Sequence, residues 1–170
     1  GLCGPHRPGH FEGVATIVAK LLIQALPDFA FFGEKDYQQL QVIKRLTRDL
    51  DLPMEIVGVP TVRDADGVAL SSRNAYLSGD ERRIVPMLYR TIGDMADRLA
   101  RGVATPAQEI ERGRAALIAA GFGRIDYLTI ADAATLEPVG RIEAPARVLV
   151  AAWLGSTRLI DNVPVVPRTG

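Results

Sequence analysis

The segment 32–36 (FGEKD) combines residue types that could bind a phosphate group. It follows a short apolar run and precedes a helical pattern, and open α/β sheets bind their ligands at such strand-to-helix junctions. Gly33 would let the backbone approach a ligand closely, the first amides of a helix favour anions, and Lys35 adds a mobile positive charge. Asp36 could cap the helix or hold Mg²⁺, and Gln39 could hydrogen-bond a small polar substrate. The same residue types also occur in ordinary surface turns, so both interpretations stay open.

A second group of polar residues lies in the segment 70–74 (LSSRN). Arg73 can hold phosphate oxygens in a fork, and the hydroxyls of Ser71 and Ser72 can donate hydrogen bonds to them. The preceding turn at Asp66-Gly67 would allow this segment to move as a lid. The alternative interpretation is a solvated loop between two domains.

His10, in the run RPGHF, has two possible roles. It could act as a general base or donor, or it could make an ordering hydrogen bond near the start of a helix, which we favour. Cys3 and His6 lie in a terminus that we expect to be frayed, and we assign them no role. No Cys and His spacing fits a structural zinc site, and the single Cys has no motif of a cysteine nucleophile.

The first part of the chain is expected to hold alternating helices and strands. Apolar residues at helical spacing predict a helix over 13–26, and a second periodic pattern predicts another over 37–50, with Asp36 at its N-cap. The short apolar runs 29–32 and 54–59 are typical of buried strands. This order is the signature of α/β units with a parallel sheet.

After Pro60 the pattern changes to helices followed by strands. Ser78 and Glu81 form the capping box of a helix expected over 79–100. Thr105 begins another helix, which ends at Gly121.

Three β-rich runs close the sequence, at 126–130, 147–153 and 157–160, with short turns between them. They predict an antiparallel sheet, so the second half is expected to be α+β. Asp161-Asn162 is interpreted as a turn and Trp153 as a core residue.

The composition excludes several classes of protein. Lys plus Arg and Asp plus Glu each number 20 among the 170 residues, so bulk charge does not favour nucleic acid or another polyanion as a partner. One Cys excludes a disulfide framework and favours a reducing, intracellular setting. No apolar run approaches the ~20 residues of a membrane span, and the first residues lack the pattern of a signal peptide. A cytoplasmic protein without membrane partners is expected.

Taken together, these segments carry a specific resemblance. The runs RPGHFEGVATIV, PDFAFFGEKDYQQL, IVGVPTVRDADGVALSSRNAYLS and VLVAAWLGSTRLIDN occur in the order and spacing of the pantothenate synthetase family, over Arg7 to about Val165. The resemblance implies a Rossmann-like nucleotidyltransferase fold. Residues 1–62 would be the C-terminal portion of its ATP- and pantoate-binding domain, and residues 63–170 its C-terminal α+β lid domain.

The resemblance also implies an activity. Members of the family use ATP and Mg²⁺ to convert pantoate to pantoyl adenylate and pyrophosphate, and β-alanine then attacks the adenylate to give pantothenate and AMP. Positive charge from Lys35, Arg73 and Mg²⁺ would stabilise the negative charge that develops on the phosphoryl oxygens. A cytoplasmic homodimer is implied as well.

Several residues receive roles by resemblance. Lys35, Ser71, Ser72 and Arg73 are implied as the catalytic group. Gln39 is implied to bind pantoate, and Asp36 is a possible ligand of the Mg²⁺ that ATP carries. The positions implied to contact ATP are Gly33, Glu34, Lys35, Asp36, Val62, Leu70, Ser71, Ser72 and Arg73.

One family motif does not occur here. The family carries a His-x-Gly-His motif that holds ATP phosphates, whereas His6 and His10 are the two histidines of this sequence. We therefore interpret the chain as the C-terminal part of such an enzyme, with little or no activity alone and with association or disorder expected in residues 1–60. The alternatives are a non-catalytic folding or interaction fragment and an adenylyltransferase for another substrate.

Overall fold

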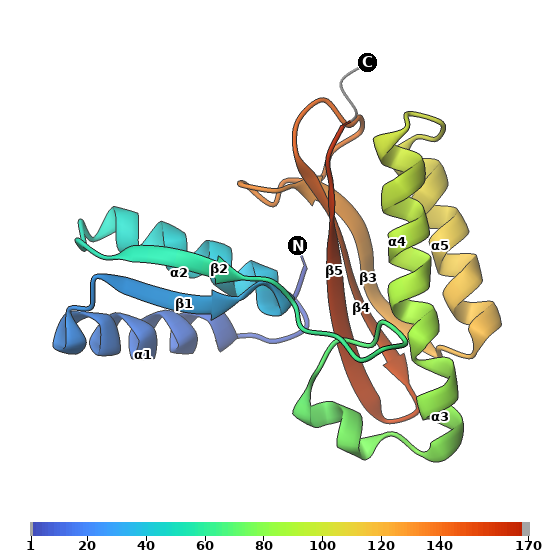
Figure 1. Cartoon of the computed structure of the whole chain (residues 1–170), viewed down its shortest axis with the longest axis horizontal. Helices are drawn as coiled ribbons and strands as arrows, with labels where there is room; N and C mark the ends of the chain where they lie inside the picture. The colour runs from blue at the N-terminus through green and yellow to red at the C-terminus, as the bar shows by residue number, and fades with distance from the viewer. Residues whose placement is uncertain (1, 168–170) are drawn as a thin grey trace. The chain divides into compact units, whose positions relative to one another are not determined.

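The computed structural model describes residues 2–167, in which helices and strands alternate first and then separate along the chain (Figure 1). Its contacts form two compact units, the first ending at Thr61 and the second beginning at Val62. One unit holds a parallel sheet and the other an antiparallel sheet. The predicted α/β fold class is confirmed.

The first unit is built around two parallel strands. Its elements are α1 (His10–Ala25), β1 (Phe29–Gly33), the 3₁₀ turn η1 (Glu34–Asp36), α2 (Tyr37–Asp49) and β2 (Glu55–Val59). The pairing of β1 with β2 runs from Phe29 opposite Glu55 to Gly33 opposite Val59. The carboxyl ends of the two strands therefore lie side by side, and η1 leaves the sheet at this edge.

Both helices of the first unit pack on one face of its sheet. Leu22 of α1 and Ile43 of α2 are buried together, and Phe32 of β1 packs against them. Because side chains alternate along a strand, Phe29 and Phe31 point to the opposite face. These two side chains are 56% and 66% exposed, respectively. One face of the sheet is thus covered by helices and the other presents aromatic surface.

The second unit packs helices on an antiparallel sheet. Its elements are η2 (Ser72–Tyr76), α3 (Gly79–Ile84), α4 (Pro86–Ala100), α5 (Pro106–Ala120), β3 (Arg124–Asp132), β4 (Ala146–Leu154) and β5 (Thr157–Val165). The strand order is β3-β4-β5, and both pairings are antiparallel. Helices α4 and α5 lie side by side along this sheet (Figure 1).

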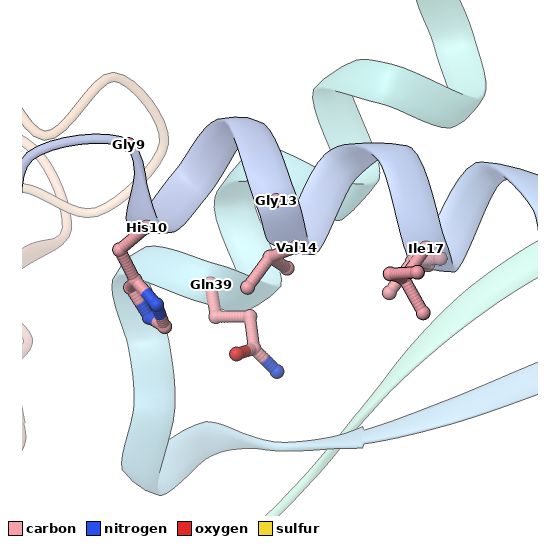
Figure 2. Close-up of a pocket in the computed structure, with 7 residues that line it drawn as sticks. Gly9, His10, Gly13, Val14, Ile17 and Gln39 are labelled. Atoms are coloured by element: carbon pink, nitrogen blue, oxygen red, sulfur yellow. The ribbon is translucent and has the colours of Figure 1, made fainter.

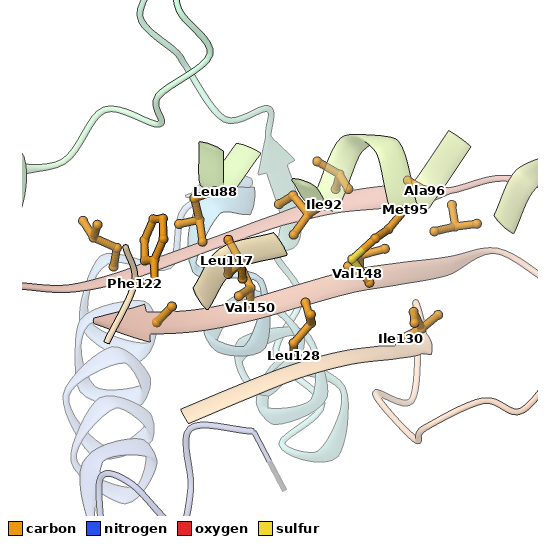
Figure 3. Packing of buried hydrophobic residues seen from close by; sticks show 14 of the residues in the cluster. Leu88, Ile92, Met95, Ala96, Leu117, Phe122, Leu128, Ile130, Val148 and Val150 are labelled. Atoms are coloured by element: carbon orange, nitrogen blue, oxygen red, sulfur yellow. The ribbon is translucent and has the colours of Figure 1, made fainter. Parts of the chain in front are cut away.

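The core of the second unit lies between these helices and the sheet (Figure 3). Ile92 and Met95 of α4 and Leu117 of α5 are fully buried against Val148 and Val150 of β4. Burying one large aliphatic side chain stabilises a fold by roughly 1.5–3 kcal/mol. This cluster is therefore the main source of stability in the second unit.

The predicted capping box at Ser78 is present, and Thr105, predicted as an N-cap, forms a second box with Gln108. Ser78 Oγ accepts a hydrogen bond from the amide of Glu81, and Thr105 does the same for Gln108. Asp36 stands at the N-cap position of α2, as expected, but its side chain accepts no hydrogen bond from the first turn of that helix. The carboxylate of Asp36 is thus not occupied in capping.

The structure differs from the sequence prediction at Pro86 and at Asp161-Asn162. The helix expected over 79–100 is divided into α3 and α4, because Pro86 has no N–H to donate to the carbonyl four residues earlier. Asp161 and Asn162 lie inside β5 rather than in a turn, since that strand continues to Val165. The second difference places a carboxylate in the sheet, where it has a partner described below.

Candidate active site

The turn that carries Lys35 lies at the carboxyl edge of the parallel sheet. Strand β1 ends at Gly33, and Glu34, Lys35 and Asp36 then form a single 3₁₀ turn that leads into α2. Gly58 of β2 lies under this turn, and a Cβ there would be 3.2 Å from Oε1 of Glu34. The sheet therefore supports the turn with bare backbone, at the edge where α/β proteins bind ligands.

A pocket of about 530 Å³ lies along the first two turns of α1 (Figure 2). Its lining residues are Gly9, His10, Gly13, Val14, Ile17, Val18 and Gln39. The side chains of His10 and Gln39 point to the same side as those of Val14 and Ile17. The pocket thus offers two polar groups beside an aliphatic wall, which suits a small ligand with a branched apolar body and polar substituents.

The residues before α1 are held by hydrogen bonds, whereas we expected a frayed terminus. The amide of Cys3 donates to Oε1 of Gln38 on α2 at 3.0 Å. The amide of His6 donates to the carbonyl oxygen of Cys3, and that of His10 to the carbonyl oxygen of Arg7. The segment that leads into His10 is therefore tied to the helix that carries Gln39.

Residues 62–70 form a tight hairpin in the second unit. The amide of Leu70 donates a hydrogen bond to the carbonyl oxygen of Val62 at 3.0 Å. The amide of Asp64 donates to the carbonyl oxygen of Val68 at 2.8 Å. Val62 and Leu70 are 63% and 50% exposed. The hairpin thus brings together two side chains that were predicted to contact ATP and presents both to solvent.

The predicted phosphate-binding residues follow this hairpin directly. Ser71 Oγ accepts a hydrogen bond from the amide of Arg73 at 3.2 Å, and Asn74 Nδ2 donates to the carbonyl oxygen of Ala69 at 3.0 Å. The side chains of Ser72 and Arg73 are exposed. The segment is therefore a capped 3₁₀ turn with a hydroxyl and a guanidinium at its surface.

Two arginines hold the hairpin. Arg63 donates to both carboxylate oxygens of Asp161 on β5, at 2.7 and 2.8 Å. Arg82 of α3 donates to Asp66 at 2.5 Å and to Asp64 at 3.1 Å. The hydrogen bond from Arg82 lowers the pKa of Asp66, and the same bond raises the pKa of Arg82. The pair of Arg82 with Asp66 is therefore charged at neutral pH.

The predicted site residues fall into one group in each unit. The first unit holds Gly33, Glu34, Lys35, Asp36 and Gln39, and the second holds Val62, Leu70, Ser71, Ser72 and Arg73. Sequence reasoning missed the aliphatic wall of the pocket, although the helical spacing of Val14, Ile17 and Val18 places them on one face. It also missed the pairing of Arg63 with Asp161, because 98 positions separate these residues and no local pattern joins them.

Among residues 2–167, no three His, Cys, Asp or Glu side chains gather as a metal site would require. Within the same range, every helix is too short or too polar to span a bilayer.

Comparison with known proteins identifies relatives along almost the whole chain. The family model described as pantoate-beta-alanine ligase matches residues 1–164. The pantothenate synthetase of Chelativorans sp. (strain BNC1) is 55% identical over 166 residues, which are 97% of this chain and 58% of the relative. That of Paramagnetospirillum magneticum (strain ATCC 700264 / AMB-1) is 54% identical over 167 residues, again with 58% of the relative covered. The chain thus spans a little more than half the length of the curated relatives it matches.

Solved structures agree with this result. The pantothenate synthetase from Thermus thermophilus superposes with a TM-score of 0.90 at 49% identity, covering 96% of this chain and 59% of that one. The pantoate-beta-alanine ligase from Francisella tularensis, complexed with beta-gamma ATP and beta-alanine, superposes with a TM-score of 0.71 at 31% identity, covering 99% of this chain and 55% of that one. The fold, the predicted motifs and the match over residues 1–164 lead to one conclusion: this chain belongs to the pantoate-beta-alanine ligase family.

Proposed function

We propose that this chain supplies the ATP- and pantoate-binding part of an enzyme that joins pantoate to β-alanine through a pantoyl adenylate. The observation that carries the proposal is the position of the Lys35 turn. It lies at the carboxyl edge of the parallel sheet and leads into the helix that carries Gln39, which lines the pocket. A phosphate-binding group and a small polar–apolar pocket are the two parts that adenylation of an acid needs.

The reaction balances without a covalent enzyme intermediate. A carboxylate oxygen of pantoate bonds to the α-phosphorus of ATP, and the bond between the α-phosphorus and the bridging oxygen breaks as pyrophosphate leaves. The amine of β-alanine then bonds to the acyl carbon, the bond from that carbon to the AMP oxygen breaks, and the nitrogen loses a proton. Negative charge develops on phosphoryl oxygens in the first step, so the site must supply fixed positive charge there.

Lys35 supplies that charge in the first unit, together with the backbone of Gly33 and Glu34. Gly33 has open space where a Cβ would stand, so the edge of the sheet leaves room for a phosphate oxygen. The first amides of α2 have no hydrogen-bond partner within the helix, so they favour an anion there. Asp36 is exposed and not engaged in capping, so it is the carboxylate available to the Mg²⁺ of Mg-ATP.

Pantoate is the acid that suits the pocket. It carries a carbon with two methyl groups, and Val14, Ile17 and Val18 form an aliphatic wall of matching character. Its hydroxyl groups and carboxylate need polar partners, which Gln39 and His10 provide. The role of His10 is then that of a hydrogen-bonding group in the pocket rather than an ordering group alone.

The second unit contributes the phosphate loop and the nucleotide contacts. Arg73 and Ser72 are exposed and stand next to Ser71, and Val62 and Leu70 present apolar side chains beside them. Guanidinium and hydroxyl groups bind triphosphate oxygens, while the apolar pair would lie against the base or ribose. In this scheme Lys35, Ser71, Ser72 and Arg73 form the catalytic group, and the second unit acts as the lid domain.

We further propose that these 170 residues do not catalyse adenylation by themselves. They contain no His-x-Gly-His sequence, and in this family that motif is expected to complete the phosphate site. A cytoplasmic, dimeric enzyme is the proposed working form. The second candidate function is adenylation of a different acid. The aliphatic wall of the pocket would accept such an acid only if it is small and branched.

The experiment uses the chain joined, in one polypeptide, to the part of the Chelativorans relative that lies outside the match; we call this protein the completed ligase. Pantothenate formation is measured with Gln39→Ala, and Gln24→Ala on the exposed side of α1 is the matched control. Loss of one hydrogen bond to a polar substrate raises the KM for pantoate roughly tenfold or more, with the KM for ATP unchanged. Equal kinetics for Gln39→Ala and Gln24→Ala would exclude this pocket as the pantoate site.

A further inference from the structure

The side chain of Arg63 anchors the hairpin 62–70 to β5, while Arg82 pairs the hairpin with α3. Arg63 donates hydrogen bonds to both carboxylate oxygens of Asp161. The side chains of Asp161 and Arg63 are 3% and 17% exposed, respectively. A guanidinium that binds a carboxylate through two parallel hydrogen bonds is fixed in direction as well as in distance. The first strand of the hairpin therefore has a defined position on β5.

The same guanidinium also holds the turn of the hairpin. Its Nη1 donates to the carbonyl oxygen of Gly67 at 3.0 Å, and its carbon lies 3.9 Å above the centre of the Tyr89 ring on α4. Gly67 has a φ of 91°, and a Cβ there would collide with the ring of Tyr89. Arg63 thus joins the strand and turn of the hairpin to β5 and α4.

Exposure to solvent changes sharply after Ala69. Ala69 is 8% exposed and forms an isolated antiparallel bridge with Arg63. The next residue, Leu70, is 50% exposed, and the side chains of Ser72 and Arg73 are exposed as well. A fixed base is therefore followed at once by the exposed segment that carries the phosphate-binding groups.

We propose that Arg63 is a positioning residue of the ligase, which sets the base from which residues 70–73 reach the phosphates of ATP. The part of this lid that moves then begins after Leu70, whose amide is still bonded to Val62, and the turn Asp66-Gly67 belongs to the fixed base. Arg63 touches no substrate and acts through the backbone of the hairpin. The proposal rests on the proposed function of the loop.

The chemistry of the pair predicts a graded series of variants. Arg63→Met removes both hydrogen bonds to Asp161 and leaves that carboxylate buried without its partner. Arg63→Lys keeps a positive charge but cannot reproduce the fork, so it restores part of the function. Arg98 offers a matched control, because it donates two hydrogen bonds to the carboxylate of Glu109 in the same bidentate way. The side chains of Arg98 and Glu109 are 24% and 0% exposed. This pair joins α4 to α5 rather than holding the hairpin.

The first arm measures steady-state kinetics of the completed ligase. A misplaced loop costs roughly 10–100-fold in kcat/KM for ATP, so we expect that loss in Arg63→Met, a smaller loss in Arg63→Lys and less than a twofold change in Arg98→Met. The melting temperatures of Arg63→Met and Arg98→Met are compared in parallel. Unchanged kinetics in Arg63→Met, or equal losses in both Met variants, would overturn the positioning role.

The second arm needs no catalysis and uses the 170-residue chain. Hydrogen exchange is followed at the amides of Asp64 and Leu70, which bond across the hairpin. We expect Arg63→Met to accelerate their exchange at least tenfold, while Arg98→Met leaves it unchanged. Equal exchange in both variants would overturn the anchoring by Arg63, whereas failure of the unmodified completed ligase to turn over would contradict the proposed function and not this anchoring.

Discussion

Met95 of α4 packs so closely against Gly113 of α5 that a Cβ on Gly113 would lie 2.5 Å from the Met95 sulfur. The same Cβ would lie 2.8 Å from a methyl carbon of Leu128 on β3. Helix α5 can approach both α4 and the sheet at this point only because position 113 has no side chain. The core that supports the hairpin and the phosphate loop depends on this contact.

Gly113→Ala is therefore expected to destabilise the chain although alanine favours helices. Overpacking of a buried site costs roughly 1–3 kcal/mol. Gly93→Ala is the matched control, since Gly93 lies in α4 with open space around its Cβ position, and there the change stabilises the helix by roughly 0.5–1 kcal/mol. Urea unfolding of the two variants measures both values, and a Gly113→Ala chain as stable as the unmodified one would contradict the packing.

Asp126 predicts a pH dependence of stability. Burial raises the pKa of this carboxyl, but hydrogen bonds from Arg158 and Trp153 outweigh burial, so the pKa in the folded chain lies below its usual value. A lowered pKa stabilises the fold at pH values above the unfolded pKa of about 3.9. This stabilisation is lost as the pH falls through the folded value.

The measurement is the free energy of unfolding between pH 7 and pH 2.5 for the unmodified chain and for Asp126→Asn. The variant is expected to be less stable at pH 7 and to lose less stability below about pH 4. Parallel curves for the two proteins would show that Asp126 does not contribute to the acid sensitivity.

The exposed face of the parallel sheet predicts self-association of the 170-residue chain. Phe29 and Phe31 present aromatic surface beside each other on that face, and exposed apolar patches of this kind favour contacts between molecules. Phe31→Ser should lower the average mass measured by sedimentation. Val103→Ser is the control, because Val103 is as exposed as Phe31, both at 66%, but lies in the turn between α4 and α5. A monomeric unmodified chain would contradict the prediction.

Local patterns in the sequence predicted the elements that depend on local physics. The periodic run of α2, the short apolar run of β1 and the capping box at Ser78 each carry their information within a few residues. The division at Pro86 was also readable, because a proline inside a helical pattern removes a backbone donor. It was missed because the capping box and the apolar spacing on both sides favoured one continuous helix.

Contacts between distant residues could not be read in this way. Asp161 follows apolar residues and precedes an asparagine, which is typical of a turn, and only its partner Arg63 explains why a carboxylate belongs in β5. The lining of the pocket was likewise predicted only in part. Gln39 was predicted as a binding residue, whereas Val14 and Ile17 line the pocket because α1 packs beside α2. The sequence thus predicts which residues are suited to chemistry better than it predicts what positions them.

The most direct test of the proposed division of the active site is the pantoate-dependent exchange of labelled pyrophosphate into ATP. We expect exchange by the completed ligase, a loss of roughly 10²–10³-fold in its Lys35→Ala variant, and none by the folded 170-residue chain alone. Exchange by the chain alone that Lys35→Ala abolishes would contradict the claim that further residues are needed, and exchange by the completed ligase that survives Lys35→Ala would contradict the assigned role of Lys35.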